Sequence, residues 1–269
     1  MQRRHSIRHL AWRGGVAMVS DGLMMSGLYP LAVHAWRAAR GEHTANALRV
    51  ALAEWGMALA VSALRPIGFW PLPGATTRGP RPIIVLHGYA MNRANFVVLA
   101  RRLAAAGLGP IYGFEYWTLG RVAAGARQLG WFVDQVREAT GAAEVDLVGH
   151  SMGGVVARYY VAFGDGDAKV RNLVTLGSPH AGTDVSAVGI GHASRELIVG
   201  SQLVQRLGSS PAPSHAKLVT ILSEADVLVP AAAQPPIVGA ERIVYPDLGH
   251  VALLGSRRVA RDIVERLGA

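Results

Sequence analysis

From residue 83 onward, short runs rich in β-branched residues alternate with longer stretches of helical periodicity. The runs with the length and composition of strands are 83–86, 108–112, 144–148, 170–176, 218–222 and 242–245. The helical stretches are 96–105, 122–140, 154–163 and 256–267. Strands that alternate with helices indicate a mostly parallel sheet with helices on both faces. We therefore predict one α/β domain over residues 83–269.

The first 65 residues have a different pattern. Val16–Val33 and Val50–Leu64 are mostly apolar but contain Asp21 and Glu54, respectively. A spanning helix needs about 20 apolar residues and tolerates a central acid poorly, so each stretch is a marginal membrane span. We predict a helical segment over 1–65 that associates with the membrane as a hairpin or an interfacial helix. The alternatives are helices packed on the body or on a partner, and a secretory signal, for which no small-x-small cleavage site follows.

Charge and composition separate this segment from the rest of the chain. Residues 66–82 are rich in Pro and Gly, which predicts a linker. Ten of the basic residues but only three acidic ones precede residue 82, a balance of +7 out of the total of +9. The remaining body has no basic stripe with interleaved aromatics, so nucleic-acid binding is not expected. A membrane surface is the expected partner of 1–65; without it, the protein is expected in the cytoplasm. The absence of Cys excludes disulfides and thiolate catalysis.

Gly149-His150-Ser151-Met152-Gly153 fits the Gly-x-Ser-x-Gly nucleophile elbow. The serine of this motif occupies a strained turn between a strand and a helix, and small residues on either side let the two elements approach. The predicted strand at 144–148 and the predicted helix at 154–163 supply that setting. Ser151 is therefore the candidate nucleophile.

A serine needs a base to remove its proton and a carboxylate to orient that base. His250 follows the last predicted strand and lies after every plausible acid, which matches the chain order of this fold. Asp226 follows the predicted strand 218–222, so its carboxylate is expected at the same sheet edge. Glu224 and Asp247 are rival acids that also read as turn residues.

The oxyanion that forms during attack needs two N–H donors. The backbone N–H of Met152 is the expected first donor, and that of Tyr89, in the loop after strand 83–86, is the expected second. His87, Gly88 and His150 flank these groups and are candidate substrate-binding residues. An ordinary strand-end turn is the alternative for the His87-Gly88 segment.

With these motifs, the sequence resembles the bacterial lipase and esterase branch of the α/β-hydrolases. The resemblance runs from about Pro82 to Leu267 and rests on four pieces. These are Val85 to Tyr89, Gly149 to Gly154, Leu176 to Thr183, and the segments around Asp226 and His250. It implies the α/β-hydrolase fold, the Ser151–Asp226–His250 triad, and a lid over about 184–214 with a helix near 193–207. The apolar residues of this helix are expected to cover the site: Leu197, Ile198, Leu203, Val204 and Leu207. A helix packed permanently on the sheet is the alternative. The family's calcium sites find no clear match, so no metal or cofactor is expected.

The resemblance implies a serine hydrolase that cleaves carboxylic esters of lipid-like or acyl type through an acyl-enzyme. Thioesterase, amidase and acyltransferase activities use the same triad and remain alternatives. A hydrolase-fold scaffold without catalysis, seated on a membrane, is the alternative from a different class.

Overall fold

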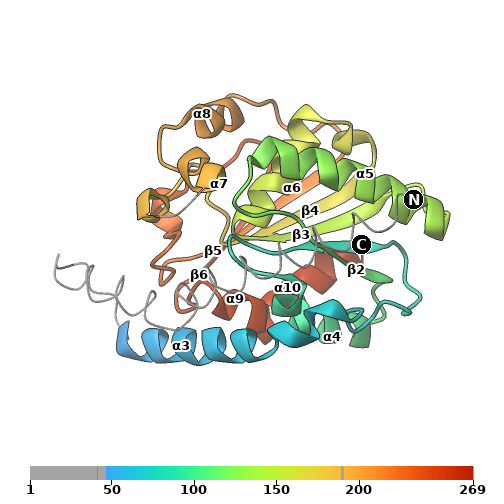
Figure 1. Ribbon diagram of the computed structural model, residues 1–269, viewed down its shortest axis with the longest axis horizontal. Coiled ribbons are helices and arrows are strands. Elements are labelled where there is room, and N and C mark those ends of the chain that lie inside the picture. The colour runs from blue at the N-terminus through green and yellow to red at the C-terminus, as the bar shows by residue number, and fades with distance from the viewer. Residues whose placement is uncertain (1–40, 42–46, 189–190, 269) are drawn as a thin grey trace, which may run out of the picture.

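The computed structural model describes residue 41 and residues 47–188 and 191–268 (Figure 1). The apolar stretch Val16–Val33, predicted to contribute to membrane association, lies outside the described residues. Within them, a central sheet stands between two layers of helices (Figure 1). This is the arrangement that the alternating pattern predicts.

Six strands form the sheet, and every neighbouring pair is parallel. Their order across the sheet is β2-β1-β3-β4-β5-β6, so the chain first winds one way from β1 and then the other from β3. The strands are β1 (Ile83–Leu86), β2 (Ile111–Phe114), β3 (Val145–His150), β4 (Val170–Leu176), β5 (Lys217–Ser223) and β6 (Glu241–Tyr245). In such a sheet, the loops at the carboxyl ends of the strands share one edge, where ligands bind.

The helices cover both faces of the sheet, and four of them lie within two residues of the predicted limits: α4, α5, α6 and α10. They are α3 (Ala47–Ala63), α4 (Val97–Ala105), α5 (Val122–Thr140), α6 (Met152–Phe163), α7 (Gly191–Glu196), α8 (Gln202–Gly208), α9 (Ala252–Gly255) and α10 (Arg257–Leu267). Short 3-10 turns lie at 65–69, 93–96, 166–168, 184–188 and 231–233.

The period-two alternation of strand side chains divides the core in two. Ile83 and Val85 point into one cluster, with residues of α4, α9 and α10, while Ile84 and Leu86 point into the other, with α5 and α6. Because both faces of the sheet are buried, its central strands are continuous apolar runs.

Two sequence predictions differ from the structure in detail. The strand expected at 108–112 begins instead at Ile111, after Gly109 with φ 142° and Pro110, which has no N–H to donate. The single lid helix expected at 193–207 is divided into α7 and α8 by Gly200, with φ 76°, and by Ser201, whose hydroxyl caps α8 by accepting from Val204 N.

The predicted apolar cover over the site is also revised. Leu197 and Leu207 are buried in the cluster that contains α5 and α6, and Leu203 packs against its edge. Ile198 and Val204 are half-buried. This part of the predicted lid is therefore packed on the body.

The described part of the N-terminal segment, α3, lies along the body beside α9 (Figure 1). Val50, Ala51, Ala58 and Val61 are buried, and Val61 joins the core cluster of α4 and α10. The part of the chain that the structure describes contains no helix with the length and hydropathy needed to cross a bilayer. Packing on the body, one of the alternatives for this segment, is what α3 shows.

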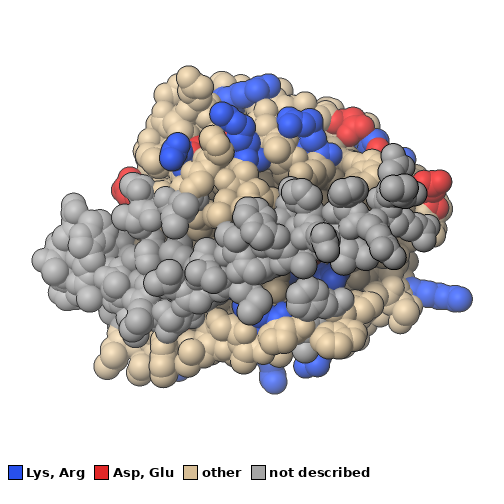
Figure 2. All heavy atoms as spheres, viewed as in Figure 1, with Lys and Arg blue, Asp and Glu red and all other residues tan. Residues whose placement is uncertain are grey.

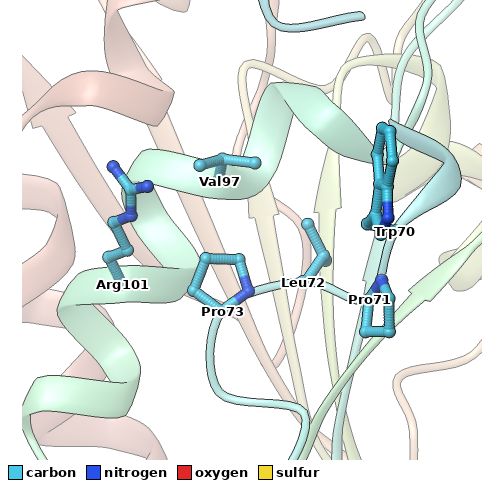
Figure 3. Close-up of a pocket in the computed structure, with 6 residues that line it drawn as sticks. All are labelled: Trp70, Pro71, Leu72, Pro73, Val97 and Arg101. Carbon is cyan, nitrogen blue, oxygen red and sulfur yellow. The ribbon is translucent and has the colours of Figure 1, made fainter. Parts of the chain in front are cut away.

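The Pro/Gly-rich stretch 66–82 also contacts the body. Leu72 is buried in the core, and the carbonyl of Gly74 accepts a hydrogen bond from Ile111 N at 3.0 Å. Together with Val97 and Arg101 of α4, residues 70–73 line a pocket of about 360 Å³ (Figure 3). The predicted linker is thus folded against the hydrolase body over much of its length.

Candidate active site

Ser151 occupies the turn between β3 and α6. Its φ of 54° and ψ of −126° lie outside the regions that a non-glycine residue normally adopts. A hydrogen bond from Ser151 N to the carbonyl of Leu176, at 2.8 Å, holds the turn against the neighbouring strand. Strain of this kind persists only where the surroundings enforce it, and it is common at functional sites.

Glycines make this turn sterically possible. A Cβ on Gly153 would lie 2.3 Å from the carbonyl oxygen of Leu86, and a Cβ on Gly149 would lie 2.5 Å from Gly154 Cα. The start of α6 therefore packs directly on β1 and β3, at distances that a side chain would prevent. This close approach is the structural reason for the small residues in the motif.

Asp226 and His250 form a buried pair at the same edge of the sheet. Asp226 Oδ2 is 2.7 Å from His250 Nδ1. Asp226 Oδ1 accepts hydrogen bonds from Leu228 N at 2.9 Å and from Val229 N at 2.8 Å. The carboxylate is thus fixed by backbone on one oxygen and orients the imidazole with the other.

Gly177, the residue after Leu176, connects this pair to the Ser151 turn. A Cβ on Gly177 would lie 3.1 Å from both Asp226 Oδ2 and His250 Nδ1, and its φ is 53°. Ser151 N bonds to the carbonyl of Leu176, so the three candidate residues, which follow β3, β5 and β6, converge around Gly177 at the carboxyl edge of the sheet. Among the described residues, no hydrogen bond joins the Ser151 hydroxyl to His250, whose Nδ1 lies against Asp226.

The electrostatics of His250 favour a base held close to its partner acid. Burial lowers the pKa of His250, but attraction to the Asp226 carboxylate, the hydrogen bond between them and the charge of Glu54 outweigh burial. The pKa of His250 is therefore raised above its ordinary value. Positive charge on this imidazole, which a general base acquires during proton transfer, is stabilised here.

The rival acids lie elsewhere. Asp247 forms an ion pair with Arg258 at 2.5 Å, and both side chains are about half exposed. Glu224 is exposed, and its backbone N–H bonds to the carbonyl of Tyr245. Of the three candidates, only Asp226 reaches His250.

The histidines predicted to border substrate are instead buried among protein groups. His150 Nε2 is 3.0 Å from the carbonyl oxygen of His250, and the two rings are 4.7 Å apart. Burial lowers the pKa of His150 well below its ordinary value, so its ring is neutral. His87 stacks on Tyr116, and His87 Nε2 is 3.2 Å from Glu115 Oε2. Both imidazoles thus support neighbouring loops, and we revise their predicted contact with substrate.

The loop predicted to supply an oxyanion donor lies beside the candidate nucleophile, Ser151. A Cβ on Gly88 would be 2.9 Å from Ser151 Cβ, and the hydroxyl of Tyr116 donates to the carbonyl of His87 at 2.7 Å. Tyr89 follows in this loop, and Met152 is the first residue of α6. The two backbone segments expected to form the oxyanion hole therefore both lie next to Ser151: Met152 directly follows it, and the loop after β1 packs against it.

Sequence reasoning missed Glu54, which lies in α3 and is only 1 % exposed. Its Oε1 accepts from Val251 N at 2.7 Å and its Oε2 from Ala252 N at 3.0 Å. These are the two residues directly after His250. The sequence signal for this contact was an acid inside an apolar helical stretch. Such an acid is compatible with a buried carboxylate that has a hydrogen-bond partner, as well as with a poor membrane-spanning helix.

One part of the chain matches a known family. Residues 81–194 match the family model described as the α/β hydrolase fold. The parallel sheet, with its serine turn between β3 and α6, has this fold.

A shorter stretch of the chain is similar to two bacterial lipases. The chain is 44 % identical over 57 residues to triacylglycerol lipases of Pseudarthrobacter phenanthrenivorans and Burkholderia plantarii. The aligned stretch is 21 % of this chain but only 17 % and 15 % of those two proteins.

Two solved lipase structures have the same fold. Bacillus licheniformis lipase BlEst2 superposes with a TM-score of 0.62 at 15 % identity, over 72 % of this chain and 94 % of that one. The Paleococcus ferrophilus monoacylglycerol lipase gives 0.53 at 16 % identity, over 71 % and 96 %.

Proposed function

We propose that this chain is a serine hydrolase that cleaves carboxylic esters of lipid-like type. The observation that carries the proposal is the convergence of a positive-φ serine turn with a buried Asp226–His250 pair at one sheet edge. The lipase relatives, described by that name, support ester bonds as the reaction centre.

The proposed reaction is a two-step acyl transfer. His250 Nε2 accepts the proton of Ser151 as Oγ attacks the ester carbonyl, and the N–H groups of Met152 and Tyr89 stabilise the oxyanion. The C–O bond to the alcohol breaks, and the alcohol departs with the proton from His250. Water then attacks the acyl-enzyme, giving its proton to His250, and the acid leaves as Ser151 regains that proton.

A substrate series tests the ester assignment. We expect turnover of p-nitrophenyl esters, rising with acyl chain length, to exceed that of matched thioester and amide substrates. Loss of all turnover in Ser151→Ala ties the activity to this site. Faster cleavage of the thioester or amide would instead favour one of the alternatives that share the triad.

Labelling with a fluorophosphonate distinguishes the enzyme from a non-catalytic scaffold. An activated serine is expected to react with the probe, and Ser151→Ala is expected to be unlabelled. A folded wild-type protein that resists the probe at every pH tested supports the scaffold.

We also propose that α3 rests on a lipid surface. Leu48, Leu52, Trp55 and Leu59 recur at helical spacing on one exposed stripe of α3. An exposed apolar stripe on a helix that contains Trp suits insertion at a membrane interface. On the face shown in Figure 2, Lys and Arg side chains are spread over the described surface, and Asp and Glu lie toward its edges.

Sedimentation with vesicles of phosphatidylglycerol and phosphatidylethanolamine tests this contact. The double change Leu52→Ser and Trp55→Ser is expected to weaken binding at least about tenfold, since each apolar side chain contributes roughly 1.5–3 kcal/mol. Trp131, which is 69 % exposed on α5, gives the matched control Trp131→Ser. Equal loss in both variants, or no binding by the unaltered protein, contradicts the proposal.

A further inference from the structure

We propose that Glu54 of α3 is a positioning residue for His250. The inference rests on the proposed function, since it assigns Glu54 a role in that same reaction. It connects the segment before the hydrolase body to a proton transfer at the carboxyl edge of the sheet.

Backbone contacts carry the first step of the argument. The two oxygens of Glu54 accept the N–H groups of Val251 and Ala252, at 2.7 and 3.0 Å. Ala252 begins α9, so these N–H groups are ones that a helix start leaves without an internal partner. The carboxylate therefore fixes the backbone next to His250. The ring of His150 holds the same loop from the other side, through the carbonyl of His250 at 3.0 Å.

The fit around Glu54 is too close to be incidental. A Cβ on Gly249 would lie 2.3 Å from Glu54 Oε2 and 2.8 Å from its Cδ. The residue before His250 must be small for the carboxylate to reach its place. Met57, one turn further along α3, likewise fills the space beside Gly255 at the end of α9.

The charge of Glu54 carries the second step. A neutral amide would avoid the desolvation that a buried carboxylate incurs, but its single oxygen would not replace both carboxylate oxygens as acceptors. The pKa of Glu54 is raised above its ordinary value by burial and by the Asp226 charge, against the hydrogen bonds from Val251 and Ala252 and the attraction of His250. In return, Glu54 favours the charged form of His250, together with Asp226. A negative charge here stabilises the imidazolium that forms when Ser151 loses its proton.

The ionisable groups that face His250 come from three elements. They are Asp226 after β5, Glu54 of α3, and His150 at the end of β3, whose neutral ring lies 4.7 Å from that of His250. Asp226 and Glu54 both raise the pKa of His250. Removing only the Glu54 charge is therefore expected to lower that pKa while leaving the Asp226 contact in place.

The test compares Glu54→Gln with Val61→Ala. Gln is nearly isosteric but neutral, and it has one amide oxygen in place of two carboxylate oxygens, whereas Val61→Ala weakens the packing of α3 in the core about two helical turns from Glu54. In the full chain, Glu54→Gln is expected to lower kcat for a p-nitrophenyl ester roughly ten- to a hundredfold, as small misplacements of catalytic groups do, with little change in KM. The acidic limb of kcat/KM against pH is expected to move to lower pH, because free His250 then loses its proton at lower pH.

Val61→Ala is expected to lower the Tm without moving that limb. A Glu54→Gln enzyme with unaltered kcat and an unmoved limb overturns the proposal. So does a Val61→Ala enzyme that loses as much kcat with the same limb shift. If Glu54→Gln does not fold, Gly249→Ala replaces it, because the added Cβ displaces the Glu54 carboxylate. The acidic limb of kcat/KM is then expected to move to lower pH. An unmoved acidic limb overturns the proposal.

Ser151→Ala, measured in parallel, keeps the two claims distinct. Activity that survives Ser151→Ala refutes the proposed function itself. An inactive Ser151→Ala beside an unaffected Glu54→Gln refutes only the role of Glu54.

Discussion

Asp226→Asn tests how the buried carboxylate controls His250. The asparagine carbonyl can still accept from Leu228 N and Val229 N, which now bond to Oδ1 at 2.9 and 2.8 Å. Its amide N–H₂ then faces His250 Nδ1, where Oδ2 now lies at 2.7 Å. Because two donors repel, the imidazole is forced to carry its proton on Nε2 and cannot accept the proton of Ser151.

The magnitude follows from this wrong tautomer. In serine hydrolases that use a triad, this change lowers kcat by about 10³–10⁴, or about 4–5.5 kcal/mol of transition-state stabilisation. Folding is expected to change little, since the substitution is isosteric and two hydrogen bonds persist. The assay is kcat/KM on a p-nitrophenyl ester, with circular dichroism to confirm the fold.

Asp247→Asn is the matched control. Asp247 is half exposed and pairs with Arg258, and such surface ion pairs contribute at most about 1 kcal/mol. Its activity is expected to stay near that of the unaltered protein. An Asp226→Asn enzyme within tenfold of the unaltered one, or an equal loss in Asp247→Asn, refutes the reasoning.

Two further predictions concern the turn and the stability of the body. Gly153→Ala is expected to abolish ester cleavage and lower the Tm, because its Cβ would lie 2.3 Å from the carbonyl oxygen of Leu86; normal activity would contradict the close packing of α6 on β1. Burial raises the pKa of Asp167, but the hydrogen bonds from Ala216, Ser214 and His215 outweigh burial and lower this pKa to about 2. This stabilisation is therefore present above the ordinary carboxyl pKa and is lost as the pH falls toward 2. In urea denaturation, Asp167→Asn is expected to cost about 1 kcal/mol at pH 7 and progressively less below pH 4; a difference independent of pH would contradict it.

The sequence anticipated those parts of the fold that depend on local periodicity. The predicted limits of β1, β4 and α5 match the structure, because each is a continuous apolar or amphipathic run with clear ends. The start of β2 was misplaced because Leu108 looks like a strand residue, while Gly109 and Pro110 still belong to the loop. The division of the lid helix at Gly200 and Ser201 was overlooked for a related reason, since apolar periodicity continues across it.

Contacts between distant segments lie beyond such reasoning. The hydrogen bond between Glu54 and Val251 joins residues 197 positions apart, and no local pattern in α3 predicts it. Sequence alone treated this acid as an obstacle to a membrane span. In the structure, its carboxylate faces backbone N–H groups of the body while the apolar stripe of the same helix faces outward. The burial of His87 and His150 was likewise not predictable, since both lie in motifs beside the half-buried residues Tyr89 and Ser151.

Mapping the covalent adduct of a fluorophosphonate by peptide mass spectrometry tests the central claim most directly. The account predicts one adduct per chain, on the peptide that contains Ser151, with a labelling rate that falls as His250 becomes protonated at low pH. An adduct on another residue, or a rate that is the same in a His250→Ala variant, contradicts it.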